Sequence, residues 1–254
     1  MSVEEIFNGL IATHNTDTLL TFIQDIKESI PPSQRTSKGI VWSLRQIRRQ
    51  LIEEGVHLTK QKHSLEILIN SNHWQVRHLT SLIATHCSIE ERNFDSYIPV
   101  IEAAANDSHF GVRESAQMAM RELMQAFPDE VLQLYDNKWI SHPEANVRRC
   151  VSESLRPVLV EGKNWLREEP EEVIKRLKRL NQDTSLYVRK SVGNNLADIS
   201  RRYPDLVLST LRKWLLENDY DKKTFFIARK ACRRVIKSHP DEVTELLRGE
   251  SVIK

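Results

Sequence analysis

The chain repeats one short phrase four times, in which a proline is followed by an acidic residue and, after one more position, by valine. The prolines are 42, 34 and 36 residues apart, at Pro128, Pro170, Pro204 and Pro240. Proline suits the first position of a helix, where its missing N–H needs no partner, and the acidic residue faces the positive end of the helix dipole. A period of this length predicts stacked pairs of helices that present a long surface.

A second phrase, an apolar residue followed by arginine, runs out of phase with the first. Its arginines are 36, 35, 41 and 40 residues apart, at Arg77, Arg113, Arg148, Arg189 and Arg229. Each step begins an apolar line with helical spacing and therefore predicts the second helix of a pair. An aspartate precedes two of these arginines by six residues, and we expect it to cap the helix and meet the arginine one turn later.

Together the phrases predict an all-α fold, a right-handed α-solenoid of HEAT-like helical repeats with about six helical pairs. We expect a single domain over residues 1–254. Residues 1–60 are less regular and read as an N-terminal cap, a loop is expected at 55–63, and regular repeats fill 61–254.

Composition narrows the class of protein. There is no apolar run near the roughly 20 residues that a membrane span needs, and the first residues lack the pattern of a signal peptide, so we expect a cytoplasmic protein without a membrane partner. The three cysteines lie far apart and read as reduced, buried thiols. Ligand spacings for a metal and glycine-rich cofactor loops are absent from the sequence, so we expect neither metal nor cofactor.

Charge is divided unevenly along the chain. Residues 1–147 carry a net charge of −6 and residues 148–254 a net charge of +8, which together give the overall +2. The basic part suggests a polyanionic partner, and the acidic part is a candidate surface for a protein partner. The alternative is that both charges belong to ordinary solvent-facing helix surfaces.

Three of the Val-Arg-type steps are followed by a second base, which gives the pairs Arg148-Arg149, Arg189-Lys190 and Arg229-Lys230. Bases at equivalent positions of stacked repeats can follow a DNA backbone, although the first arginine of each step has a structural ion pair as its default role. Two carboxylates share a helix stripe with such groups: Glu153 with Arg149 and Arg156, and Asp198 with Asn195 and Arg202. Each stripe is either a surface ion pair or a carboxylate held in a cationic groove.

Trp139 and Trp214 are expected in the core, whereas Trp165, Phe225 and Phe226 are the aromatic candidates for a site.

Two stretches resemble a known family. Residues 142–157 read HPEANVRRCVSESLRP and residues 183–200 read DTSLYVRKSVGNNLADIS. Both are similar to the DNA alkylation repair family of HEAT-like-repeat DNA glycosylases, of the AlkC/AlkD-like kind, and the resemblance is strongest over 142–207. The chain departs from the family pattern after Arg156-Pro157, where additional residues precede Trp165, and in its first ~105 residues.

The resemblance implies a protein that binds duplex DNA and excises N3- or N7-alkylated purines, such as 3-methyladenine and 7-methylguanine. It implies Asp198 as the catalytic carboxylate and Glu153 as the second. The residues expected at the DNA are Arg148, Arg149, Arg156, Arg189, Lys190, Asn195, Arg202, Arg229, Lys230 and Arg233. Two alternatives remain open: a non-catalytic binder of distorted or branched DNA, and a protein–protein scaffold.

Overall fold

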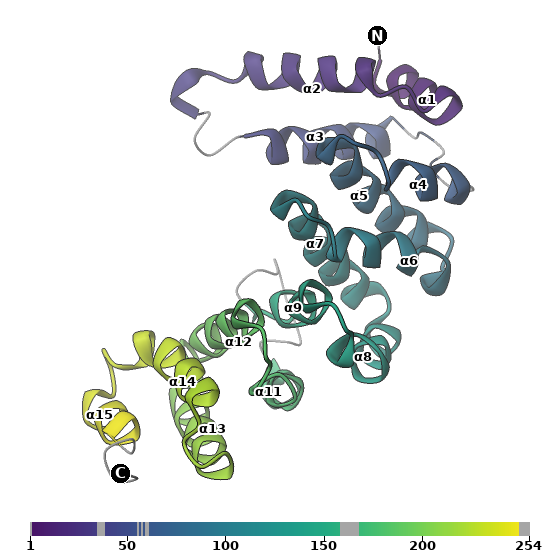
Figure 1. Cartoon of the computed structure of the whole chain (residues 1–254). Coiled ribbons are helices and arrows are strands. Elements are labelled where there is room, and N and C mark those ends of the chain that lie inside the picture. Colours follow the sequence, from purple (N-terminus) through teal and green to yellow (C-terminus); the bar gives the residue numbers. More distant parts are fainter. Residues whose placement is uncertain are drawn as a thin grey trace. The chain divides into compact units, whose positions relative to one another are not determined.

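The computed structural model describes residues 2–34, 39–54, 56, 58, 61–157 and 168–248, and all regular structure in these ranges is helical. Figure 1 shows the helices in their order along the chain. The first are α1 (Val3–Thr13), α2 (Asp17–Ser29), the 3₁₀ helix η1 (Pro32–Gln34), α3 (Ile40–Glu53), α4 (Lys62–Leu68), α5 (Trp74–Glu90), α6 (Phe94–Ala105), α7 (Phe110–Ala126) and α8 (Pro128–Asn137). Then come η2 (Trp139–Ser141), α9 (Ala145–Ser154), α11 (Pro170–Lys178), α12 (Leu186–Ile199), α13 (Pro204–Glu217), α14 (Lys222–Val235) and α15 (Pro240–Arg248).

The four prolines of the repeated phrase begin helices, as predicted. Each is the first residue of its helix: Pro128 of α8, Pro170 of α11, Pro204 of α13 and Pro240 of α15. The acidic residues that follow lie in the first turn of these helices. The expected loop at 55–63 is only partly within the described residues, and α4 already begins at Lys62.

Contacts along the chain group into two compact units, Met1–Val131 and Leu132–Lys254, and each is described by itself. The single domain over 1–254 stays a prediction. In the first unit α3 packs on α5 and α5 on α7, while α4 and α6 pack beside α5. The core of this unit comes from the inward faces of these helices, among them Leu44, Val76, Leu82, Val112 and Leu123.

In the second unit the helices begun by the Val-Arg-type steps form one row. Helix α12 packs against α9 on one side and against α14 on the other, and α13 and α15 pack beside α14. Their predicted apolar lines are buried, including Val147, Val151, Val192, Leu196 and Cys232. Helices α12 and α14 approach closely at Gly193, where an added Cβ would lie 2.8 Å from the Cβ of Lys230. The glycine therefore sets the distance between these two helices.

Other predictions about the core are confirmed. Trp139 and Trp214 are buried, and the three cysteines are free and buried. Burial raises the pKa of the Cys232 thiol to about 11, so it is a neutral thiol at neutral pH. In the described part of the chain, no helix combines the length and the apolar character that crossing a bilayer requires.

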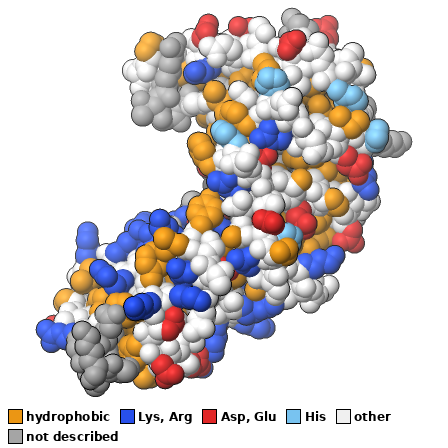
Figure 2. Space-filling view, in the orientation of Figure 1, with side chains coloured by type: hydrophobic (Ala, Val, Ile, Leu, Met, Phe, Trp, Pro, Cys, Tyr) orange, Lys and Arg blue, Asp and Glu red, His pale blue; other side chains and the backbone are white. Residues whose placement is uncertain are grey.

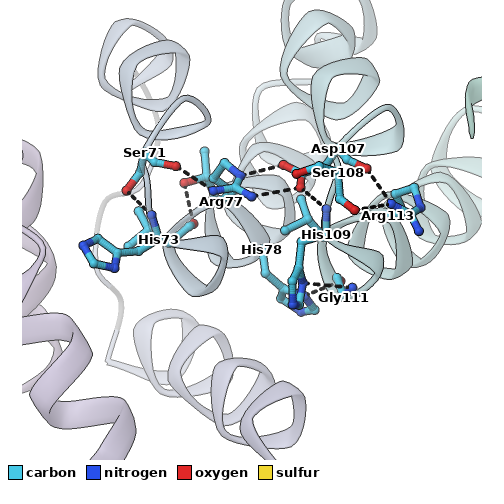
Figure 3. Close-up of polar contacts among 12 residues, drawn as sticks. Ser71, His73, Arg77, His78, Asp107, Ser108, His109, Gly111 and Arg113 are labelled. Atoms are coloured by element: carbon cyan, nitrogen blue, oxygen red, sulfur yellow. Dashed lines mark hydrogen bonds and ion pairs between the residues drawn. The ribbon is translucent and has the colours of Figure 1, made fainter. Parts of the chain in front are cut away.

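In the first unit Arg77 joins two neighbouring loops, whereas Arg113 donates to the carbonyl oxygens of Asp107 and Ser108 in its own loop (Figure 3). In the first unit Arg77 donates to the carbonyl oxygen of Ser71 in its own loop and to both carboxylate oxygens of Asp107 in the next loop, at 2.5 and 2.9 Å. The same carboxylate accepts from the backbone N–H of His109 just before α7. One arginine therefore links two consecutive repeats, which is the structural role expected for Arg77.

The second unit repeats this arrangement at Arg148. Its guanidinium donates to the carbonyl oxygens of His142 and Pro143 and to both carboxylate oxygens of Asp183, at 2.6 and 3.0 Å. Arg189 in turn donates to the carbonyl oxygens of Asp183 and Thr184. The expected contact between this aspartate and the arginine six residues later is thus made at the main-chain carbonyl, because the carboxylate lies against the arginine of the preceding repeat.

The fifth step, Ala228-Arg229, does not continue this series. Asp221 is the N-cap of α14, whereas the N-caps of α7 and α12 are His109 and Ser185, so the expectation that Asp107 and Asp183 cap these helices was wrong. Each of the three aspartates accepts from the backbone N–H two residues later. The position six residues after Asp221 is Ile227, which is buried. Arg77, Arg113, Arg148 and Arg189 are each the fourth residue of their helix, whereas Arg229 is the eighth residue of α14. Arg229 is therefore not equivalent to the other arginines, and its side chain is exposed.

Candidate nucleic-acid interface

A buried ionic cluster lies between α9 and α12 of the second unit. The guanidinium of Arg156 donates to Asp198 Oδ2 from Nε at 2.8 Å and from Nη2 at 2.5 Å. Its Nη1 donates to Glu153 Oε2 at 3.1 Å. Burial acts to lower the pKa of Arg156, but the two carboxylates outweigh that effect and raise it. One guanidinium therefore bridges the two predicted catalytic carboxylates.

Glu153 has further partners on both helices. Its Oε1 accepts from Ser191 Oγ at 2.9 Å and lies 3.3 Å from Nη2 of Arg149. The guanidinium of Arg149 also covers the ring of Tyr187, 4.1 Å from its centroid, in cation–π geometry. Helical spacing of three and four residues places Arg149, Glu153 and Arg156 on one side of the chain, as the sequence indicated.

Asp198 is enclosed by arginines from both neighbouring repeats. Its side chain has 0% exposed surface, and Arg234 of α14 lies 3.6 Å from its Oδ1, an ion-pair distance too long for a hydrogen bond. Among the residues that the structure describes, Oδ1 is buried without a hydrogen-bond partner. In this geometry the carboxylate can stabilise positive charge only after a guanidinium has moved away, and Arg234 is the more weakly held and the more exposed of the two.

Helix α14 presents a concentrated positive charge. It carries six basic residues and no acidic one, namely Lys222, Lys223, Arg229, Lys230, Arg233 and Arg234. Burial, then the nearby charges of Arg233 and Lys190 on α12, lower the pKa of Lys230. Figure 2 shows Lys and Arg side chains gathered over this part of the chain. Like charges held together in this way favour an anionic partner.

An open groove of about 520 Å³ lies on the same helix. It is lined by Lys222, Phe225, Phe226, Arg229 and Lys230. Phe225 is 8% exposed, so it belongs mainly to the core, whereas Phe226 is half-buried. The groove therefore offers one aromatic edge between three basic side chains.

The predicted site residues fall into separate groups. Glu153, Asp198, Arg149 and Arg156 form the ionic cluster, and Asn195 is buried beside it with its amide on the carbonyl oxygen of Ser152. Lys190, Arg229, Lys230 and Arg233 belong to the exposed basic surface of α12 and α14, and Arg233 also bonds Asn194 Oδ1 at 2.9 Å.

The remaining predicted residues lie elsewhere. Arg148 and Arg189 hold the loops together, and Arg202 is exposed with its guanidinium 5.5 Å from the centroid of the Tyr203 ring. Trp165 lies outside the described residues. Sequence reasoning did not identify Tyr187 or Arg234 as site residues. Arg234 follows Asp198 by 36 residues, one repeat length, which is the signal that points to it.

Comparisons with known proteins agree with this architecture. No family model matches the chain. A curated relative, the uncharacterized protein YhaZ of Bacillus subtilis strain 168, is 37% identical over 115 residues, which cover 44% of this chain and 31% of that protein. The matched segment thus spans less than a third of the length of YhaZ.

Three solved structures are similar over most of the chain. AlkD2 from Streptococcus mutans has a TM-score of 0.61 at 23% identity and covers 84% of this chain and 97% of its own. The alkylpurine DNA glycosylase AlkC of Pseudomonas fluorescens, bound to DNA containing an abasic site analog, has a TM-score of 0.64 at 24% identity. The match covers 97% of this chain and 68% of the AlkC chain. The protein smu.31 of Streptococcus mutans UA159 has a TM-score of 0.62 at 24% identity, and the match covers 84% of this chain and 97% of the smu.31 chain. These similarities confirm the predicted all-α, HEAT-like helical-repeat fold.

Proposed function

We propose that the chain binds duplex DNA through the basic surface of α12 and α14, by contacts with phosphates rather than with base sequence, as a DNA repair protein of the alkylpurine type. The observation that carries the proposal is the set of six basic residues on α14 without an acidic one, joined by Lys190 of α12. The similarity in fold to AlkC, whose structure contains DNA, supports the same partner.

The physical reason is electrostatic. Lys190, Lys230 and Arg233 repel one another, and the close approach of α12 and α14 at Gly193 keeps them together. A phosphate between them relieves this repulsion and releases counterions from the DNA. Since packed helices lie about 8–10 Å apart, bases on α12 and α14 form two adjacent rows that can meet successive phosphates.

Fluorescence anisotropy with a plain duplex at several salt concentrations tests DNA binding. If Lys190, Arg229, Lys230 and Arg233 each neutralise one phosphate, log K should fall with log salt at a slope of about −3.6, from about −0.9 per phosphate. Replacing Lys190 and Arg233 with alanine should make the slope shallower by about 2. Replacing Arg212 and Lys213, which are exposed on α13, removes the same charge elsewhere and should change the slope much less. An equal effect of both double variants, or no duplex binding by the wild type, would refute the proposal.

Excision of alkylpurines is the second candidate function, and the cluster of Asp198 and Glu153 favours it. A cationic alkylpurine is a good leaving group, so the enzyme needs to stabilise the oxocarbenium-like sugar, which a nearby carboxylate does electrostatically. Within the described ranges, the ion pair with Arg234 at 3.6 Å is the one interaction of Asp198 Oδ1. If a phosphate attracts Arg234, this oxygen is the one that becomes available.

Release of free 3-methyladenine or 7-methylguanine from methylated DNA tests excision. We expect wild-type release and its loss in Asp198→Asn and, to a smaller extent, in Glu153→Gln, with duplex affinity retained. Far-UV circular dichroism should first establish that each variant is folded. If the wild type binds duplex DNA and releases neither base, the chain is a non-catalytic binder, and branched or distorted duplexes become the substrates to compare.

A protein–protein scaffold is the alternative from another class. It predicts no salt-dependent affinity for duplex DNA, so the anisotropy measurement separates it from DNA binding. The acidic N-terminal half remains a proposed surface for a protein partner, and this proposal is independent of the DNA contacts.

A further inference from the structure

Three rings stack in the first unit, at the N-terminal ends of α5 and α7. The ring centroids of Trp74 and His109 lie 4.2 Å apart at an interplanar angle of 16°, and those of His109 and Phe110 lie 5.0 Å apart at 26°. The rings of Trp74 and the buried His78 form a T-shaped pair, with centroids 6.3 Å apart and an interplanar angle of 79°. The stack is therefore anchored in the core at one end.

Hydrogen bonds and a glycine hold the middle ring in place. The backbone N–H of His109 donates to the Asp107 carboxylate, and the N–H of Gly111 donates to His109 Nδ1 at 3.2 Å, as Figure 3 shows. A side chain at Gly111 would place its Cβ 3.1 Å from Cζ3 of Trp74 and 3.2 Å from atoms of the His109 ring. Glycine at this position thus lets the rings of Trp74 and His109 pack against the backbone.

The other end of the stack is open. Phe110 is 67% exposed, more than any other large apolar side chain in the described residues. Burial lowers the pKa of His109, and the charges of Arg77 and Arg113 lower it further against the opposing effect of Asp107. The middle ring is therefore neutral at pH 7, and Phe110 extends an uncharged stack into solvent.

We propose that the exposed face of Phe110 binds one unpaired nucleobase. The inference rests on the proposed function, which supplies the nucleic acid. A base is planar and aromatic and can continue a stack of nearly parallel rings, and such stacking tolerates any sequence. A protein surface is a poorer match, because the exposed residues near Phe110 in the chain, Ser108 and Glu114, are polar, whereas protein docking surfaces expose larger continuous apolar patches.

The experiment uses the whole chain and two DNAs, a continuous short duplex and the same duplex with one unpaired 2-aminopurine. Anisotropy should show about tenfold tighter binding of the second DNA, and the fluorescence of the 2-aminopurine should change on binding. In Phe110→Ala the preference and the fluorescence change should disappear while affinity for the continuous duplex stays unchanged. Phe110→Trp should retain both.

Two controls define the outcome. Phe110→Leu keeps apolar area but has no aromatic face, so it should behave like Phe110→Ala; a leucine variant that behaves like the wild type would overturn the inference in favour of general apolar docking. Leu216→Ala removes another exposed apolar side chain, on α13, and should have no effect. If the wild type binds both DNAs equally, the inference alone fails, whereas absence of binding to either DNA removes the proposed function and the inference with it.

Discussion

Replacing Arg156 with methionine should destabilise the second unit strongly, because this guanidinium neutralises two buried carboxylates. It makes two short contacts with Asp198, whose side chain has no exposed surface, and one with Glu153, whose side chain is 6% exposed. Removing one partner of a buried ion pair typically costs about 3–5 kcal/mol. Arg234 stays 3.6 Å from Asp198, and Arg149 and Ser191 stay with Glu153, so we expect the lower end, about 3 kcal/mol.

Urea unfolding followed by circular dichroism measures this loss as a change in the midpoint. The double variant Arg156→Met with Asp198→Asn removes the uncompensated charge together with its partner, so it should be more stable than the single arginine variant. Arg202→Met changes an exposed arginine nearby and should cost less than about 0.5 kcal/mol. A loss below about 1 kcal/mol in Arg156→Met, or strictly additive effects in the double variant, would refute the reasoning.

Three further predictions concern stability. His78 is buried and its pKa is lowered to about 4 from 6.5, mainly by burial, so between these pH values the unfolded chain binds a proton that the folded chain does not. The free energy of unfolding is therefore highest above pH 6.5 and falls as the pH falls toward 4, by about 2 kcal/mol between pH 7 and 5. Urea titrations should show that His78→Gln lacks this part of the pH dependence. Gly193→Ala forces a Cβ against Lys230 and should cost about 1–3 kcal/mol in thermal or urea unfolding, and an unchanged melting temperature would contradict the close helix approach. Asp183→Ala removes both the bidentate partner of Arg148 and the acceptor for the backbone N–H of Ser185, and we expect a loss of about 2–4 kcal/mol in the same assay, whereas a loss near zero would mean that the loop contact contributes little.

Much of the fold could be predicted from the sequence because its signals are local. A proline that begins a helix, an acidic residue in the first turn and apolar residues at helical spacing act within one or two turns of the chain. For the same reason Trp139, Trp214 and the cysteines could be assigned to the core. The position predicted for the last step was wrong because Ala228-Arg229 matches the phrase locally. Helix α14 begins directly after its N-cap Asp221, so Arg229 lies further along this helix than the other arginines lie along theirs.

The candidate site was predictable in part. The stripe of Arg149, Glu153 and Arg156 follows from the helical period, and the two carboxylates were expected among arginines. The enclosure of Asp198 was not predicted, because repeats of unequal length shift the facing positions: Arg156 lies 42 residues before it and Arg234 lies 36 residues after it. The spacing of Arg234, one repeat length, was the one signal for it in the sequence.

The sequence by itself determined that the chain forms paired helices, where the regular ones begin, and that its positive charge lies toward the C-terminal end. Only the tertiary structure decided which arginines hold loops together, as Arg148 does, and which remain exposed for a partner, as Arg229 does. The physical reason is the distance along the chain over which each interaction acts. Helix signals act between neighbours in the chain, whereas an ion pair such as that of Arg156 and Asp198 depends on how one repeat is packed against the next.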